Sequence, residues 1–232
     1  MKIEILFPEW CNLFGDMSNM SYLKQCLPNA EFIETAFEDE PKFVKEDVNL
    51  IYMGPMTEKT QEKVIDKLMP LKARINELIE GGTVFLFTGN AFEMLGNCIE
   101  NTDGSNIPTL GIFDFYAKRN MMKRHNSLIR GEFEDTTILG FKTQFTMSYP
   151  SDESNGFVRV IKGIGLNKKA KFEGIHYKNF FGTYIIGPIL VMNPSFTKKI
   201  LKLMGSESAE LAFEEEVNEA YKKKLADFLA KG

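Results

Sequence analysis

The strongest constraint on the fold is an uninterrupted apolar run at residues 83–87, which leads directly into Thr88-Gly89-Asn90 and a short helical segment, 91–95. A run of this kind is typical of a strand buried on both faces of a parallel sheet. A strand that turns sharply into a helix lifts one side chain above the sheet edge and places backbone amides beside it, as in a nucleophile elbow. The same pattern also fits an ordinary strand-to-helix turn built around a glycine, because Gly89 carries no reactive group.

Strands and helices alternate along the first half of the chain. The predicted strands are residues 2–7, 31–37, 49–53 and 83–87, and the clearest predicted helix, with one apolar stripe, is 57–81. This alternation predicts a flavodoxin-like, doubly wound α/β fold with a mostly parallel sheet and helices on both faces. Open sheets of this type bind ligands beyond the carboxyl ends of their strands, where Gly54 and Gly89 fall.

The second half is predicted to consist of β-rich insertions. Short strand-like runs lie at residues 110–115, 127–133, 139–149, 157–161 and 188–192, with a hairpin at 172–184. An amphipathic helix at 209–229 belongs to a helical C-terminal segment of about 197–232. No linker or repeat interrupts the sequence, so residues 1–232 are predicted to form a single domain.

The composition argues against several classes of function. The net charge is -4 and the basic residues are spread along the chain, which does not suggest a nucleic-acid-binding surface. No apolar run is long enough to span a membrane and residues 1–8 do not fit a signal peptide, so we expect a cytoplasmic protein. Three scattered cysteines and two distant histidines indicate reduced thiols and no metal site. No cofactor is expected, since the segment 163–165 is too short for a phosphate-binding loop.

Several segments resemble, in chain order, the motifs of one enzyme family. They are Phe-Pro-Glu-Trp-Cys-Asn-Leu-Phe-Gly-Asp-Met-Ser-Asn at 7–19, Gly-Pro-Met-Thr-Glu at 54–58, Gly-Asn-Ala-Phe-Glu-Met-Leu-Gly at 89–96, Ile-Pro-Thr-Leu-Gly-Ile-Phe-Asp at 107–114 and Tyr-Lys-Asn-Phe-Phe-Gly-Thr-Tyr-Ile-Ile-Gly-Pro at 177–188. The segment at 89–96 is similar to the family's Cys-Gly-Gly-Tyr-Gln-Leu-Leu-Gly elbow. The chain thus resembles the cobyric acid synthase branch of class I glutamine amidotransferases. It especially resembles the small subunits that pair with a Mur-ligase-like protein to amidate cell-wall lipid precursors.

The resemblance also implies that the catalytic groups are missing. The family's nucleophilic cysteine corresponds to Gly89 and its catalytic histidine to Ile186. Neither replacement can attack an amide or transfer a proton, and glutamine hydrolysis needs both steps. Gly54 and Pro55 correspond to the family's oxyanion loop, where Pro55 has no backbone N–H to donate. If the scaffold is retained, Gly89, Ile186 and Pro55 should still face one another across a shallow, weakly polar cleft.

A fourth departure lies in the stretch that resembles the family's substrate-binding loop. The family's Gly-Phe-Glu-x-His corresponds to Gly-Phe-Lys-Thr-Gln at residues 140–144. Lys142 therefore reverses a charge and Gln144 replaces an imidazole. Four parts of one catalytic site have changed together, which favours a loss of the chemistry over a shift of the alignment.

Three hypotheses about function follow. The first is a catalytically inactive, glutaminase-like protein that binds or regulates an ATP-dependent Mur-ligase-like enzyme or another synthetase, because amidotransferases of this branch dock on such partners. The second is an active amidotransferase or hydrolase with relocated catalytic groups, for which Cys11 and His176 are the candidates. The third is a small-molecule sensor that uses the old cleft. Glu58 and Glu93 lie near this cleft and can do acid–base work, although carboxylates at a helix start more often face water.

Overall fold

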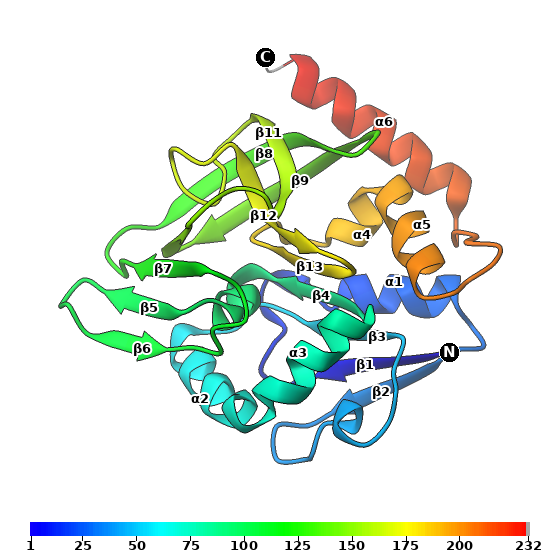
Figure 1. The fold of residues 1–232 in the computed structure, drawn as a ribbon. Helices are drawn as coiled ribbons and strands as arrows, with labels where there is room; N and C mark the ends of the chain where they lie inside the picture. Colours follow the sequence, from blue (N-terminus) through cyan, green and yellow to red (C-terminus); the bar gives the residue numbers. More distant parts are fainter. Residues whose placement is uncertain (231–232) are drawn as a thin grey trace.

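The structure, a computed structural model, describes residues 1–230 and is built around a nine-stranded sheet (Figure 1). The strand order is β2-β1-β3-β4-β13-β12-β11-β8-β9. The parallel part consists of β2 (Glu31–Thr35), β1 (Lys2–Leu6), β3 (Leu50–Met53), β4 (Val84–Thr88) and β13 (Phe180–Thr183). The antiparallel part consists of β12 (Phe172–Tyr177), β11 (Gly156–Lys162), β8 (His125–Phe133) and β9 (Thr136–Gln144).

A separate four-stranded sheet has the order β10-β7-β5-β6. Its strands are β10 (Thr146–Pro150), β7 (Phe115–Arg119), β5 (Cys98–Asn101) and β6 (Asn106–Pro108). Ile99, Phe115 and Ala117 of this sheet are buried in a hydrophobic core that they share with the large sheet. The small sheet therefore packs on the body of the molecule, beside the end of β4.

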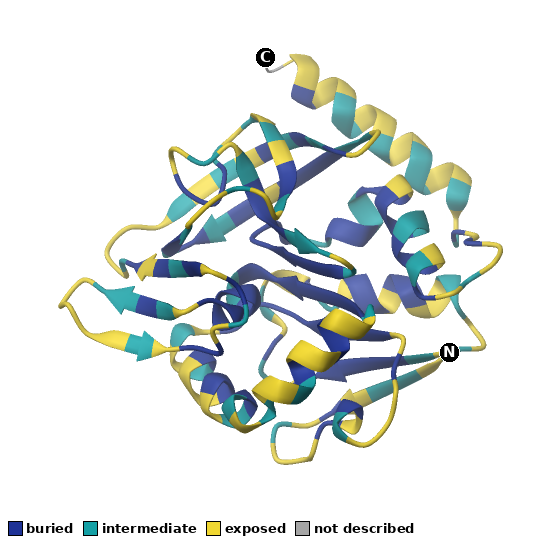
Figure 2. Ribbon diagram, viewed as in Figure 1, coloured by how far each residue is buried: buried dark blue, intermediate teal, exposed yellow. Residues whose placement is uncertain are grey.

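Helices cover both faces of the large sheet and create two hydrophobic cores (Figures 1 and 2). One core lies under α2 (Glu58–Leu68) and α3 (Lys72–Gly81); the other lies under α1 (Ser18–Cys26), α4 (Ile189–Met192), α5 (Pro194–Leu203) and α6 (Glu214–Ala230). Strand β4 contributes side chains to both cores: Phe85 and Phe87 lie in the first core, and Val84 and Leu86 lie in the second. This two-sided burial explains the continuous apolar run at 83–87 and confirms the predicted α/β fold with a parallel-rich sheet.

The single helix predicted for residues 57–81 is interrupted. Helix α2 ends at Leu68, a 3-10 turn η3 (Met69–Leu71) follows, and α3 begins at Lys72. Pro70 lies in this turn, and because proline has no backbone N–H it cannot continue the ladder of helical hydrogen bonds. The prediction of one continuous helix was therefore wrong.

Two of the strands predicted for the second half are absent. Residues 110–114 form a loop in which Leu110 and Phe113 donate their amides to the carbonyls of Met94 and Leu95 at 2.8 and 2.9 Å, and only Phe115 belongs to a strand, β7. The run at 188–192 is the short helix α4 rather than a strand. Short apolar runs fit a buried strand and a buried helical turn equally well, which is why periodicity misassigned them.

The other elements of the second half follow the predictions with shifted ends. Strands β8 and β11 and the β12–β13 hairpin are confirmed, whereas the run predicted at 139–149 divides into β9 and β10, which belong to different sheets. The C-terminal helix α6 begins at Glu214, later than predicted, and residues 231–232 of the predicted helical segment lie outside the described residues. Within residues 1–230, none of the helices has the length and apolar character that crossing a membrane requires.

Candidate functional site

A pocket of about 190 Å³ lies at the carboxyl ends of β3 and β4. Its walls come from the loops after β1 and β3, the turn after β4, the ends of β9 and β10, and the segment after β13. The lining residues are Leu13, Phe14, Pro55, Met56, Thr57, Glu58, Gly89, Asn90, Glu93, Arg124, Thr143, Gln144, Phe145, Thr146 and Ile186. Four of the residues singled out in the sequence, Gly89, Ile186, Pro55 and Gln144, therefore face one pocket, which we call the elbow pocket.

Gly89 follows the last residue of β4 and opens the 3-10 helix η4 (Gly89–Leu95). Its φ is +60°, a left-handed backbone conformation that side chains disfavour. A Cβ atom at this position would overlap the Cβ of Pro55 and lie 3.2 Å from its Cα. The turn has the form of an elbow, but the space above it is filled by proline.

The loop after β3 offers no free amide at the two positions that face the elbow. Pro55 has no N–H, and the Met56 amide donates to the Asn90 side-chain oxygen at 3.0 Å. The Asn90 amide group in turn donates to the Met56 carbonyl at 2.9 Å, which clamps the loop to the elbow. Gly54 lies behind this loop, where an added Cβ would overlap the carbonyl oxygen of Cys11. Because its amides are absent or already paired, the loop is not arranged to stabilise an oxyanion.

Ile186 lies just after β13 and forms a bridge with β9, with its amide donating to the Phe141 carbonyl at 2.9 Å. Its side chain is only 1% exposed. An apolar side chain at this point cannot activate a nucleophile or transfer a proton. The elbow pocket thus has neither a nucleophile at Gly89 nor a base at Ile186.

A buried aspartate fixes the backbone on both sides of the pocket. Asp16 is fully buried and accepts hydrogen bonds from the Tyr52 hydroxyl at 2.6 Å, from the Thr88 hydroxyl, and from the Gly187 amide at 3.1 Å. Thr88 precedes Gly89 and Gly187 follows Ile186 in the chain. Burial raises the pKa of Asp16, although the hydrogen bonds from Thr88 and Tyr52 oppose this rise. The sequence showed Asp16 only as part of a motif, and its role as a connector was missed.

The two residues at the former substrate loop lie in different environments. Lys142 is 1% exposed and turned away from the pocket, with its ammonium group donating to the Gly165 carbonyl at 2.5 Å. Burial lowers the pKa of Lys142 to about 8, and the nearby Glu173 carboxylate opposes this shift. Gln144 lines the pocket and donates to the Thr146 carbonyl at 2.6 Å. Only Gln144 of this pair can therefore meet a ligand in the pocket.

Glu93 does not face water, so that expectation was wrong. Its carboxylate is 1% exposed and accepts hydrogen bonds from the Gln61 amide and the Tyr184 hydroxyl, each at 2.9 Å. Burial raises the pKa of Glu93 to about 7, and the bonds from Gln61 and Tyr184 only partly offset this rise. Arg119 donates to the other end of the Gln61 side chain at 2.7 Å. The sequence signal that could have indicated a site role for Glu93 was the elbow motif, because Glu93 corresponds to the glutamine of the family's motif.

The structure does not bring Cys11 and His176 together. The Cys11 thiol lies in the first core, 3.9 Å from the Met56 sulfur, where burial raises its pKa to about 12. His176 stacks on Phe181 in the second core, with ring centroids 4.7 Å apart. The two cores occupy opposite faces of the large sheet. A protonated thiol and a distant imidazole do not form a nucleophile–base pair.

A parallel-rich α/β sheet with an elbow and a pocket at its carboxyl edge is a scaffold that glutamine amidotransferases share with other α/β proteins. The sequence profile of the CobB/CobQ-like glutamine amidotransferase domain matches residues 2–194. The chain therefore belongs to the CobB/CobQ-like glutamine amidotransferase family.

Two curated relatives carry the same description, lipid II isoglutaminyl synthase (glutamine-hydrolyzing) subunit GatD. The protein from Staphylococcus aureus (strain N315) is 28% identical over 193 residues, which cover 82% of this chain and 79% of the relative. The protein from Streptococcus pneumoniae (strain ATCC BAA-255 / R6) is 25% identical over 240 residues, covering 100% of this chain and 92% of the relative.

Solved structures support the fold. A glutamine amidotransferase from Thermotoga maritima has a TM-score of 0.52 and 12% identity, covering 98% of this chain and 84% of its own. A second glutamine amidotransferase has a TM-score of 0.54 and 12% identity, covering 87% of this chain and 98% of its own. At such identities the likeness concerns the fold alone.

Proposed function

We propose that this chain is a glutamine amidotransferase-like protein without glutaminase activity. It acts as a binding or regulatory partner of an ATP-dependent, Mur-ligase-like amidating enzyme. The observation that carries the proposal is the contact between Gly89 and Pro55. Gly89 supplies no nucleophilic group, and Pro55 fills the space that a side chain at this position would need.

Three further features support the loss of activity. Ile186 supplies no base, and the Met56 amide is already paired with Asn90. The potential substitute thiol, Cys11, is buried with its pKa raised to about 12, so almost none of it is the nucleophilic thiolate near neutral pH. A functioning acyl-transfer site needs a nucleophile, a base and oxyanion donors together.

The partner is inferred from the relatives. Both are described as subunits of a lipid II isoglutaminyl synthase, and the alignment with the pneumococcal subunit covers 100% of this chain. A subunit that retains its scaffold while losing its active site can still occupy its place in a complex. We therefore propose that the chain keeps a docking surface for a Mur-ligase-like enzyme acting on a cell-wall lipid precursor.

The test combines the chain with the Mur-ligase-like enzyme of the same organism and measures amidation of the lipid precursor. We expect a complex that uses ammonium as its nitrogen donor and gives no amidated product with glutamine alone. A complex between a glutamine-hydrolysing amidotransferase subunit and its own ligase serves as the positive control. Amidation supported by glutamine alone would contradict the loss of glutaminase activity, and failure to form a complex would contradict the proposed partner.

A further inference from the structure

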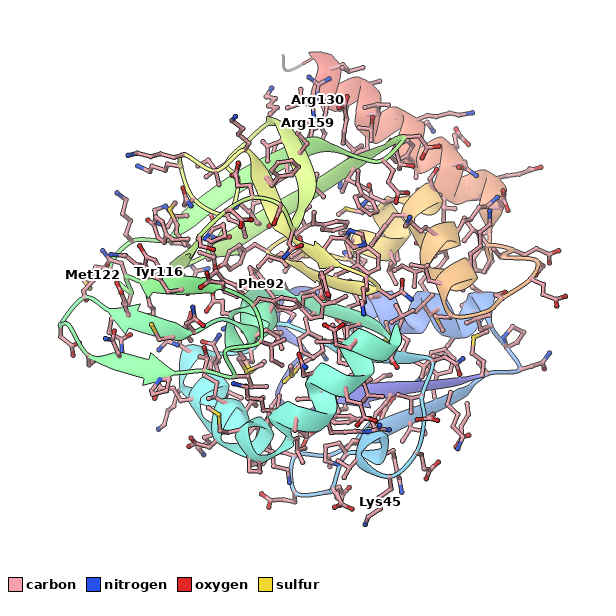
Figure 3. The ribbon with its side chains drawn as sticks, in the orientation of Figure 1. Lys45, Phe92, Tyr116, Met122, Arg130 and Arg159 are labelled. Atoms are coloured by element: carbon pink, nitrogen blue, oxygen red, sulfur yellow. The ribbon has the colours of Figure 1, made fainter. Side chains whose placement is uncertain are left out.

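A larger pocket, about 950 Å³ in volume, lies on the side of the molecule formed by β7, β10 and the loop after β11. Strand β7 is labelled on this side in Figure 1, and Figure 3 labels Tyr116 and Met122 there. We call it the basic groove, because its lining includes Lys118, Arg119, Lys123, Lys168 and Lys169. None of these residues lines the elbow pocket. The two pockets share one lining residue, Phe145, and the loss of glutaminase activity proposed above is argued without the groove.

Three carboxylates, those of Glu100, Asp152 and Glu153, line the groove beside its five cations, so the lining keeps a small net positive charge. Glu100 pairs with Lys118 at 3.0 Å, and the Glu153 carboxylate accepts a hydrogen bond from the Lys171 amide at 2.7 Å. Within residues 1–230, Lys168 and Lys169 form no ion pair. In a chain of net charge -4, a concentration of cations in one concave site favours anionic ligands.

The pKa of the histidine in the groove, His125, is also affected by the nearby cations. His125 lines the groove, and its pKa is lowered, first by burial and then by Lys123, Lys168 and the buried Lys142. Neighbouring cations disfavour a further positive charge in the same way that they favour a bound negative one. The imidazole is therefore neutral at physiological pH and can accept or donate a hydrogen bond to a ligand.

Two ordered turns hold the lysines in place. The Asn167 side-chain oxygen accepts the amides of Lys169 and Ala170 at 2.9 and 3.1 Å, and its amide group donates to the Ser148 carbonyl at 2.9 Å. On the other turn, the Lys123 amide donates to the Asn120 carbonyl at 3.0 Å. Because the backbone is already fixed at these turns, ligand binding orders fewer degrees of freedom of the protein and costs less conformational entropy.

Aromatic rings line the groove together with its cations. Phe145 and Tyr149 line it, and the Tyr149 ring stacks on Tyr116 with centroids 5.3 Å apart and an interplanar angle of 15°. Arg119 is 5% exposed and uses its terminal nitrogens on Glu62 and Gln61, while its buried Nε has no partner. Flat rings beside cations suit a ligand that joins an aromatic ring to an anionic group.

We propose that the basic groove binds a nucleoside diphosphate or triphosphate. The phosphates lie against Lys123, Lys168 and Lys169, and the base lies on the floor formed by Tyr149. The volume is within the range of pockets that enclose small-molecule ligands. This site is independent of the function proposed for the elbow pocket, and it would remain if that function were disproved.

The first test is a calorimetric titration of the full chain with ADP at low salt. Reversing the charges of the turn, with Lys168→Glu and Lys169→Glu together, should weaken ADP binding by about tenfold or more, because two attractive contacts become repulsive. The matched control is Lys202→Glu with Lys222→Glu on α5 and α6, which makes the same change in net charge on the opposite side (Figure 1). No binding of ADP to the unaltered chain, or an equal loss in both variants, would overturn the proposal.

The second test separates the base from the phosphates. ADP should bind more tightly than either pyrophosphate or adenosine, since it uses both parts of the groove. Tyr149→Leu keeps the apolar bulk but removes the ring face, so it should weaken ADP several-fold while leaving pyrophosphate unchanged. Equal affinity for ADP and pyrophosphate, or an equal effect of Tyr149→Leu on both, would show that no nucleoside is recognised.

Discussion

Pro55 occupies the space that a side chain at position 89 would need. A Cβ built on Gly89 would overlap the Cβ of Pro55, and the glycine has a φ of +60°. The two residues therefore depend on each other: proline can lie over the elbow because the elbow residue has no side chain. This packing turns two separate sequence differences into one structural arrangement.

Gly89→Ala should therefore destabilise the protein more than the same substitution at a left-handed glycine with open space around it. The clash with Pro55 should cost about 1–3 kcal/mol, in addition to about 1–2 kcal/mol for a side chain in the left-handed region. The matched control is Gly104→Ala, where φ is +85° but nothing lies within 4 Å of the added Cβ. Urea unfolding measures both free energies, and equal losses at the two positions would show that Pro55 does not block the elbow.

Restoring the two catalytic side chains should not restore the enzyme. In the double variant Gly89→Cys with Ile186→His, the Met56 amide stays paired with Asn90 and Pro55 still offers no donor. Loss of one oxyanion donor alone typically lowers kcat by about a hundredfold or more. Ammonia release from glutamine is the measurement, with circular dichroism to establish folding. Robust activity in a folded double variant would mean that these two replacements alone had removed the activity.

Asp16→Ala should destabilise the protein and loosen the elbow pocket. The change removes the carboxylate that accepts from the Thr88 hydroxyl, the Gly187 amide and the Tyr52 hydroxyl, and only Tyr52 keeps the carbonyl of residue 16 as an acceptor at 3.0 Å. We therefore expect a loss of about 2 kcal/mol or more. Asp39→Ala, at an exposed position, is the control and should change stability by less than about 0.5 kcal/mol. Thermal unfolding compares the two, and equal small effects would contradict the connecting role of Asp16.

Glu93 should make stability depend on pH. Its pKa is raised in the folded protein to about 7, so the folded state holds a proton that the unfolded state releases. The carboxyl therefore costs stability progressively as the pH rises from about 4.5 to about 7, by up to about 3 kcal/mol at 1.36 kcal/mol per pKa unit. Relative to Glu93→Gln, the unaltered protein should lose stability between pH 5 and pH 8 in urea titrations. Parallel pH profiles for the two proteins would contradict the raised pKa.

Sequence patterns predicted the parallel half of the fold well because its signals are local. The run at 83–87 is apolar on both sides of the strand, and that is the pattern of two-sided burial that β4 shows. The turn at Gly89 was likewise visible from its glycine. The strand predicted at 188–192 failed because a short apolar run does not distinguish a helical turn from a strand.

The polar interior of the site could not be predicted in the same way. Asp16 and Glu93 are acidic residues, and acidic side chains are usually exposed to solvent. In the folded protein both are buried, Asp16 against Tyr52 and Glu93 against Tyr184. Such contacts join residues far apart in the chain, and no local period encodes them. The family resemblance predicted that Gly89 and Pro55 face each other, but not that Pro55 takes the space of a side chain at position 89.

The central claim, that this amidotransferase scaffold has lost its chemistry, is tested most directly by ammonia release from glutamine by the purified chain. A working glutaminase of the same family serves as the positive control, and the Cys11→Ser and His176→Phe variants are assayed alongside. The account predicts no ammonia above the blank for any form of the chain, because Gly89 supplies no nucleophile and Ile186 supplies no base. Steady ammonia release that survives repurification and disappears in the Cys11→Ser or His176→Phe variant would contradict it.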